Sequence, residues 1–210
     1  MAVEMKLGDY IKASVDIVKA NLPGAAVAGL LMNLATAISI VGQVGAFVFP
    51  PLGLIALLAI PVALVQGVFV INYMRAVKQA KHEAKPIAVG DILNFENIVD
   101  KVVGGFAWGL GFACCCIPGV LILFTPCILA DRPGTSFMNA IKAALAFGKA
   151  NLVPSLLLAL VCLILAYAGS IACLVGMFIT GPIGMGAIYL AYEEHKIAVE
   201  AAAAEGGVAL

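Results

Sequence analysis

Charged residues along the chain are confined to short segments that separate three long apolar runs. Residues 20–74, 102–130 and 151–192 contain no Asp, Glu, Lys, Arg or His. A membrane span needs about 20 apolar helical residues to cross roughly 30 Å of hydrocarbon. The first and third runs are each long enough for two crossings. Each therefore predicts a helical hairpin whose two ends lie on the same side of a membrane.

Proline marks the turns that these hairpins require. Phe49-Pro50-Pro51 interrupts the first run near its middle, and Pro61 predicts a kink in the returning helix. The expected helices are residues 22–48 and 52–80 in the first hairpin and residues 152–167 and 171–192 in the last.

The middle run is long for one helix and short for two. As one straight helix it would reach roughly 43 Å at 1.5 Å per residue. A single crossing would place its two flanks in different compartments, yet both flanks are basic, and the positive-inside tendency assigns both to the cytoplasm. Ile117-Pro118-Gly119 supplies a turn near its centre. These features favour a third hairpin, although one crossing and a shallow hairpin both remain open. The basic flanking residues are Arg75, Lys78, Lys81, Lys85 and Lys101 before the run and Arg132, Lys142 and Lys149 after it.

Segments with helical amphipathic periodicity precede the three hairpins. Residues 4–20 alternate an apolar face with a charged one, as interfacial helices do. Gly90-Asp91 predicts the start of a second such helix, and Thr135 or Ser136 can cap a third. The apolar faces are Leu7, Tyr10, Ile11, Ser14, Val15 and Val18 in the first, Ile92, Phe95, Ile98, Val99 and Val102 in the second, and Phe137, Ile141 and Leu145 in the third.

Short motifs recur at equivalent points of this pattern. Ile11-Lys12-Ala13 and Lys19-Ala20-Asn21-Leu22 return as Ile141-Lys142-Ala143 and Lys149-Ala150-Asn151-Leu152. The sequence therefore predicts a threefold internal repeat. The fold class we expect is an all-α integral membrane protein with six membrane helices as three hairpins, each preceded by an interfacial amphipathic helix. One domain would cover residues 1–210, with units at about 1–86, 87–132 and 133–197 and a C-terminal tail at 198–210.

Composition agrees with lipid as the main solvent. The chain is 63% hydrophobic and 11% charged, and its mean hydropathy is +1.10, which excludes an ordinary water-soluble domain. Its 12 basic and 12 acidic residues cancel, so no global charge attracts nucleic acid.

Residues of the middle and third units resemble a known family. Ile117-Pro118-Gly119, Pro126, residues 130–133 and then Ala140, Lys142, Gly148-Lys149 and Asn151 are similar to the bacterial integral membrane proteins of the DUF975 type. The related membrane domain of some glycerophosphodiester phosphodiesterases shares the pattern. The resemblance covers about residues 90–165 and implies a multi-span helical bundle of unassigned activity. It carries over no phosphodiesterase chemistry, because the chain has no hydrolase domain.

Catalytic chemistry has little support in the sequence. The charge-free runs exclude a carboxylate pair or a proton relay within lipid, and His82 and His195 stand in charged segments where surface positions are expected. We therefore expect no enzyme activity, no cofactor and no metal site. Cys114-Cys115-Cys116 has the wrong spacing for a tetrahedral metal site. Packed apolar cysteines are favoured, while a disulfide to Cys173, a soft metal and acyl attachment stay open, as does the redox state of the triplet.

Uncharged polar residues and small residues are the remaining candidates for function. Asn33, Gln66 and Asn72 are positioned to line a pathway through the membrane, although hydrogen bonds between helices explain them equally simply and are favoured. Small residues at helical spacing predict faces on which helices approach closely. These packing faces are Gly105, Gly109 and Ala113 in the middle unit and Ala172, Gly176 and Gly184 in the last.

Two functions follow as expectations. The first is a non-enzymatic structural or membrane-organising protein, a curvature or scaffold protein that self-associates. The alternative is a small permease or channel for an uncharged or weakly polar solute. Membrane lipid and a homo-oligomeric partner are expected, nucleic acid is not, and a soluble partner is undetermined. The expected location is the bacterial cytoplasmic (inner) membrane, as a multi-pass protein with both termini cytoplasmic.

Overall fold

A computed structural model describes residues 3–113, 117–171 and 176–210. The described residues form helices and no strand, which confirms the all-helical class. The elements are α1 (Leu7–Ala20), α2 (Leu22–Val48), the 3₁₀ helix η1 (Pro50–Leu58), α3 (Ala59–His82), α4 (Val89–Ile92), α5 (Ile98–Ala113), α6 (Ile117–Leu121), α7 (Thr125–Asp131), α8 (Phe137–Ala150), α9 (Leu152–Ile171), α10 (Met177–Glu194) and α11 (Lys196–Glu205).

The first hairpin closely follows its prediction. Helix α2 has the expected bounds, and the chain returns through η1 before α3 begins at Ala59. Pro61 lies in the first turn of α3, directly after the 3₁₀ helix η1. The proline predicted to kink the returning helix therefore lies where the chain changes from a 3₁₀ helix to an α-helix.

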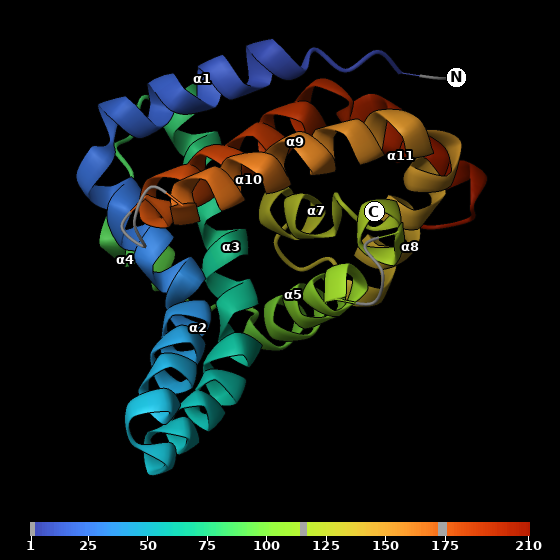
Figure 1. Ribbon diagram of the computed structural model, residues 1–210. Coiled ribbons are helices and arrows are strands. Elements are labelled where there is room, and N and C mark those ends of the chain that lie inside the picture. The colour runs from blue at the N-terminus through green and yellow to red at the C-terminus, as the bar shows by residue number, and fades with distance from the viewer. Residues whose placement is uncertain (1–2, 114–116, 172–175) are drawn as a thin grey trace.

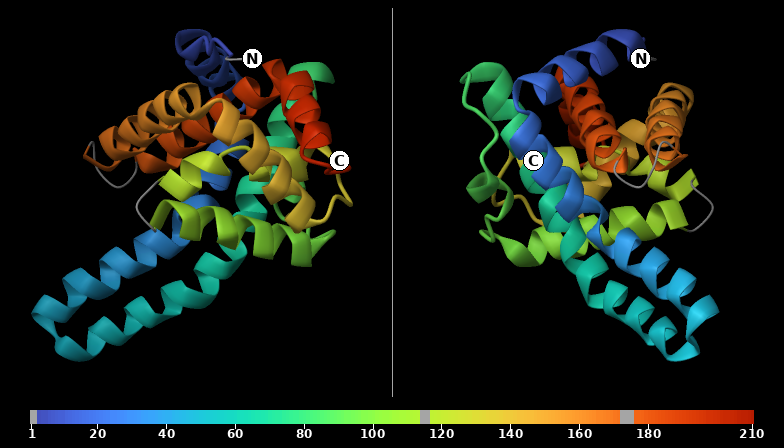
Figure 2. Two further views of the ribbon diagram at one scale, coloured as in Figure 1. Left: turned by 90° about the vertical axis from the view of Figure 1, so that its right-hand side faces the viewer. Right: turned by 60° about the vertical axis from the view of Figure 1, so that its left-hand side comes forward.

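The far part of this hairpin projects from the rest of the molecule (Figures 1 and 2). We call residues 41–60 the arm and the remainder of the fold the body. Helix α1 lies at the opposite end of the body from the arm, packed on α10. Helices α9 and α10 pack together, and α10 crosses α2 within the body instead of running along the arm.

The second unit differs from its prediction. No separate amphipathic helix precedes its hairpin, because the helix that starts at Val89 ends at Ile92 and α5 begins only at Ile98. The Asn94 side chain accepts the backbone N–H of Glu96 at 2.8 Å, and Asn97 has a left-handed φ of 52°. Both features are typical of turns. Phe95, Ile98 and Val99 are exposed.

The return half of the middle hairpin is broken into two short helices. The predicted turn at Ile117-Pro118-Gly119 is instead the first turn of α6, where proline is well tolerated. Residues 122–124 form a turn, and α7 follows with Pro126 near its start. The cysteine triplet at 114–116 lies outside the described residues.

The third unit matches its prediction more closely. Ser136 caps α8 by accepting the N–H of Asn139 at 3.3 Å, as predicted for Thr135 or Ser136. Helix α9 then leaves α8 at an angle of 107°. The segment after α10 is ordered as α11, which packs on α8 and buries Val199 and Ala203.

The first and third units share one structural detail at the junction of their first two helices. Asn21 donates from Nδ2 to the carbonyl of Ile17 at 2.9 Å, and its Oδ1 accepts the N–H of Ile87 at 3.0 Å. Asn151 donates to the carbonyl of Phe147 at 3.2 Å and accepts the N–H of Val3 at 3.0 Å. The recurring Lys-Ala-Asn-Leu motif thus performs the same local task twice.

Helix length and composition identify the candidate membrane spans. Among the described residues, Leu22–Val48 and the helical segment Gly53–His82 are long and apolar enough to cross a membrane. The bent pair of α8 and α9 is a third candidate if it forms one broken span. The described part of the chain therefore has two or three candidate spans, and the six predicted membrane helices are not confirmed.

Candidate functional site

A cavity of about 240 Å³, partly open to the surface, lies where five helices of the body meet. Its walls come from α2, α3, α5, α9 and α10, together with Leu123 in the turn before α7. Most of the lining is aliphatic or aromatic, and no charged side chain of the described residues contributes to it. The polar side chains of the lining are Asn33, Gln66, Trp108 and Thr180.

Hydrogen bonds hold the polar lining in place. Asn33 donates from Nδ2 to the carbonyl of Gly29 at 2.8 Å and lies 3.5 Å from the carbonyl of Met177. Gln66 donates from Nε2 to the carbonyl of Met32. Within the described part of the chain, neither amide oxygen accepts a hydrogen bond. Each oxygen therefore keeps its capacity to accept a hydrogen bond.

Trp108 contributes its ring to the lining, while its polar atom lies elsewhere. The indole Nε1–H is inaccessible to solvent and has no hydrogen-bond partner among the described residues. The ring makes an edge contact with Phe112, whose centroid lies 5.1 Å away at an interplanar angle of 68°. A buried donor without a partner costs about 1–3 kcal/mol, and because a water-sized probe does not touch this nitrogen, the donor does not face the cavity space.

The predicted pathway residues are only partly brought together. Asn33 and Gln66 line the cavity, whereas Asn72 lies outside it, buried near the charged end of α3. Asn72 donates to the carbonyls of Ile92 at 2.9 Å and Asn94 at 2.6 Å, and accepts from Lys101 Nζ at 2.7 Å. With these groups satisfied, Asn72 acts as a connector between α3 and the start of α5.

The predicted packing residues divide in the same way. Gly105 meets Gly67 where α5 crosses α3, since a Cβ on Gly105 would lie 2.4 Å from the Gly67 Cα. Gly176 closely approaches the backbone of Gly169. Gly109 and Gly184 instead line the cavity. Ala172 and the side chain of Ala113 lie outside the described part of the chain.

Ion pairs gather at the end of the body opposite the arm, which we call the charged end. The Asp131 side chain is 3% exposed and pairs with Lys78 and Lys196, both at 2.6 Å. Burial by itself raises the pKa of this carboxyl, but the hydrogen bonds and charges of Lys196 and Lys78 outweigh it, so the pKa lies below its ordinary value. Further pairs are Lys6 with Glu194, Lys81 and His82 with Glu193, and Arg132 with Glu200.

One histidine departs from the expected surface position. His82 is exposed and pairs with Glu193, whereas His195 is buried and lies 3.2 Å from the Tyr10 hydroxyl. Burial lowers the pKa of His195, the Glu194 carboxylate opposes that shift and Lys6 adds to it; the resulting pKa lies below its ordinary value. This buried contact joins α1 to the end of α10.

The two described cysteines are free, buried thiols. Cys127 lies 3.7 Å from the Met74 sulfur, and Cys162 lines the cavity with its Sγ 3.5 Å from the Gly184 carbonyl. No group of three metal-binding side chains occurs among residues 3–113, 117–171 and 176–210. The proposed alternatives for Cys114, Cys115, Cys116 and Cys173 fall outside these ranges.

No family model matches the chain, and neither a curated protein nor a solved structure does. The resemblance to the DUF975-type membrane proteins therefore stays a prediction. Sequence reasoning located Asn33 and Gln66 from their polarity in apolar helices, but gave no sign of Trp108, which reads as an ordinary apolar position.

Proposed function

We propose that this chain is a non-enzymatic membrane-organising protein that enters the bilayer from one side as a wedge. The supporting observation is its asymmetry: a narrow apolar arm at one end and a broad body with the ion pairs at the other (Figure 1). The body would displace lipid mainly in the near leaflet, and the arm alone would reach the far one. Such unequal occupancy bends or orders a membrane.

The arm supports this proposal because its exposed surface is apolar. Phe47 is 92% exposed and Val48 is 85% exposed, and no charged residue occurs between residues 20 and 74. Isolated apolar side chains on a surface are common, but a contiguous apolar patch of this kind marks a membrane or partner contact. Other large exposed apolar residues of the arm are Val41, Val44, Phe49, Leu54, Leu57, Leu58 and Ile60.

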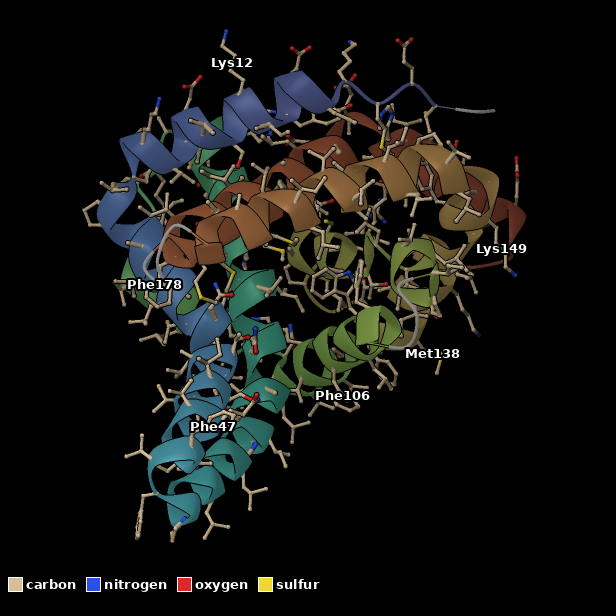
Figure 3. All side chains as sticks on the ribbon, viewed as in Figure 1. Lys12, Phe47, Phe106, Met138, Lys149 and Phe178 are labelled. Carbon is tan, nitrogen blue, oxygen red and sulfur yellow. The ribbon has the colours of Figure 1, made fainter. Side chains whose placement is uncertain are left out.

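The charged end supports a position of the body at the membrane–water interface. Figure 3 shows Lys12 on the outward face of α1, at the far end of the molecule from Phe47 on the arm. Helix α1 buries Tyr10, Ser14 and Val18 against the body. Its charged face is thus available to water and headgroups. The N-terminal segment at Val3 and helix α11 both lie in the body, so the proposal places both termini on the cytoplasmic side.

Helix lengths support the proposal that the three hairpins enter the bilayer to different depths. At 1.5 Å per residue, α2 extends about 40 Å, whereas α5 extends about 24 Å and α7 about 11 Å. In our proposal all three predicted hairpins contact lipid from the cytoplasmic side and only the first crosses fully. We keep three units that each contact lipid, although the second has no separate amphipathic helix before it, and we place the protein in a bacterial inner membrane.

We also propose that the chain self-associates through the arm. Close helix contacts at several glycines of the body are already made within the chain. A Cβ on Gly29 would meet the Phe178 carbonyl oxygen, and one on Gly148 would meet that of Leu121. The exposed arm is the surface left for a second copy within lipid.

Reconstitution into vesicles tests the proposal. Wild-type protein at a high protein-to-lipid ratio is expected to tubulate or shrink vesicles seen by electron microscopy. Phe47→Lys should abolish this effect, because it places a charge on the arm. Ile197→Lys is the matched control, since Ile197 is also highly exposed, at 82%, but lies on α11 in the body. Vesicles that stay spherical with well-inserted wild-type protein would refute the wedge.

Topology is tested separately by single-cysteine labelling from each side. The three-hairpin arrangement requires residues 132–140 and both termini to react only from the cytoplasmic side. Labelling of residues 132–140 from outside would exclude it.

A second candidate function is a small permease for an uncharged solute, favoured by the meeting of Asn33 and Gln66 at one cavity. Flux into protein-containing vesicles that Gln66→Ala abolishes would support transport. Membrane deformation without flux would support the wedge alone.

A further inference from the structure

We propose that the cavity between α2, α3, α5, α9 and α10 is a binding site for one acyl chain of a membrane phospholipid, which enters sideways from the bilayer. The inference rests on the proposed membrane location of the chain, because the ligand reaches the site through lipid. It does not require that the protein bends the membrane.

The lining of the cavity is suited to hydrocarbon. No charged side chain of the described residues contributes to it, so a charged headgroup entering the cavity would lose its hydration without compensation. Asn33 and Gln66 donate to backbone carbonyls of α2, and Thr180 donates to the carbonyl of Gly176 at 3.1 Å. The donor groups of these polar side chains thus already have partners within the protein. The apolar lining includes Met32, Val70, Leu123, Leu163, Met185 and Ile188.

The opening of the cavity lies on the flank of the body. The cavity is partly open to the surface, and the exposed members of its described lining are Gly109 on α5 and Leu163 on α9. Helix α5 lies nearer the arm and α9 nearer α1 (Figures 1 and 2), so the opening between them faces sideways. The large exposed apolar side chains within one helical turn of these two residues include Phe106, Leu110, Leu160 and Ile164. A flank of this composition favours contact with acyl chains over contact with headgroups.

The size of the cavity limits the ligand to part of one chain. An engineered apolar cavity of about 150 Å³ accommodates benzene. By proportion, the cavity of about 240 Å³ accommodates about ten carbon atoms. One acyl chain fills this space over part of its length, and a second chain would need about the same volume again. The headgroup and the other chain therefore stay outside, on the apolar flank.

Small buried residues leave the space that the chain occupies. Ala159 and Cys162 on α9 and Gly184 on α10 line the cavity and are buried. A Cβ on Gly184 would make ordinary contact with Cys162 at 3.6 Å, so no close backbone approach requires a glycine there. Apolar walls that face empty space lose dispersion contacts. In a bilayer, acyl chains are the molecules at the opening that can restore these contacts.

Photo-crosslinking from within the bilayer tests the proposal. Full-length protein is reconstituted into phosphatidylcholine vesicles in which a small fraction of the lipid carries a diazirine near the end of one chain, and the labelled residues are mapped by mass spectrometry. We expect labelling at Val70 and Ile188, which line the cavity and are 5% and 3% exposed, so that lipid outside the cavity does not reach them. Phe47 on the arm should be labelled in the same sample, because it is exposed.

Filling the cavity should remove the buried labels alone. Gly184→Leu should lower labelling at Val70 and Ile188 at least about tenfold by occupying the space, while labelling at Phe47 stays unchanged. Gly8→Leu is the matched control, because Gly8 lies in α1 with open space around it. If Gly184→Leu does not fold, Ala159→Leu fills the same cavity from α9.

Two further probes identify the source of the chain. Phosphatidylglycerol with the same diazirine chain should label the cavity as strongly as phosphatidylcholine does, because the headgroup stays outside. A free fatty acid with that chain is the alternative source. Labelling of Val70 and Ile188 by the fatty acid and by neither phospholipid would overturn the assignment to a membrane phospholipid.

The label at the arm separates this inference from the proposed function. Labelling at Phe47 without labelling at Val70 or Ile188 would overturn the acyl-chain site and leave the membrane location intact. Labelling at the two buried residues that neither Gly184→Leu nor Ala159→Leu reduces would also overturn it. An absence of labelling at all three residues would contradict both the site and the membrane location. Vesicles that stay spherical while the buried residues are labelled would refute the wedge alone.

Discussion

Two glycines on α5, one helical turn apart, should respond oppositely to the same substitution. Gly105 faces the backbone of Gly67 on α3, whereas Gly109 faces open space. Alanine at each position adds one methyl group to the same helix, so the pair isolates the effect of helix contact. We expect Gly105→Ala to destabilise the fold and Gly109→Ala to stabilise it.

The magnitudes follow from the geometry. A Cβ on Gly105 would lie 2.4 Å from the Gly67 Cα, while ordinary contact begins at 3.4 Å. The two helices must therefore separate by about 1 Å, and overpacking of this kind costs about 1–3 kcal/mol. Separation also disturbs the Lys101–Asn72 hydrogen bond nearby. Gly109→Ala gains about 0.5–1 kcal/mol of helix propensity. The two variants should thus differ by roughly 2–4 kcal/mol.

Reversible unfolding in mixed detergent micelles measures this difference, with the fluorescence of Trp108 as the probe beside both sites. Gly8→Ala, on α1 with no neighbour within 4 Å, reports the propensity gain without the cavity. Unfolding free energies that agree within about 0.5 kcal/mol for Gly105→Ala and Gly109→Ala would refute the α3–α5 contact and the placement of Gly109 at the cavity.

Three further predictions concern the body. Asp131→Asn should lower the free energy of unfolding by about 1–3 kcal/mol, because it leaves the partly exposed Lys78 and Lys196 unpaired. Because the pKa of Asp131 is lowered in the folded state, the stabilisation by its carboxylate is present above the ordinary pKa of about 4 and is lost as pH falls through the folded pKa. Unfolding measured along an acid titration checks this. The pKa of His195 is also lowered, so acidification below about pH 6.5 should destabilise wild type more than His195→Asn when melting is followed against pH. Ser136→Ala should cost about 0.5–2 kcal/mol by removing the cap of α8, measured by denaturant unfolding, whereas the same change at the neighbouring threonine should cost little.

Local signals accounted for the helices of the first and third units. Helices α1 and α8 are amphipathic over their full length, and each ends at a Lys-Ala-Asn-Leu junction where the Asn side chain bonds back to the preceding turn. Helix α2 is a long apolar run with Pro23 in its first turn. Such periodicity and end signals are present in the sequence itself.

The second unit shows where such signals fail. The apolar periodicity from Ile92 to Val102 is real, but Asn94 and Asn97 impose turn geometry inside it. The backbone carbonyl of Asn94 then accepts from Asn72 and Lys101. This network depends on α3 packing beside the turn, so periodicity alone predicts a helix there.

The cavity could not be predicted because it is a property of packing. Asn33, Gln66 and Trp108 come from three different helices. Their shared location depends on helix crossings at which glycines let two backbones come into contact. In the sequence, a glycine at such a contact cannot be distinguished from a glycine that lines a cavity. Only the neighbours of Gly105 and Gly109 distinguish them.

The arm and the cavity have a common structural origin in the contact between α2 and α10. A Cβ on Gly29 would lie 1.9 Å from the Phe178 carbonyl oxygen, so the start of α10 rests directly on α2 at that point. Beyond Gly29, α2 continues for about 28 Å to Val48. Because α10 crosses α2 here instead of following it, no helix of the body covers the far part of the first hairpin, residues 41–60, which forms the arm. On the inner side of the same crossing, Asn33 and Thr180 line the space between α3, α5 and α9. The crossing thus determines both how far the arm extends from the body and where the cavity lies.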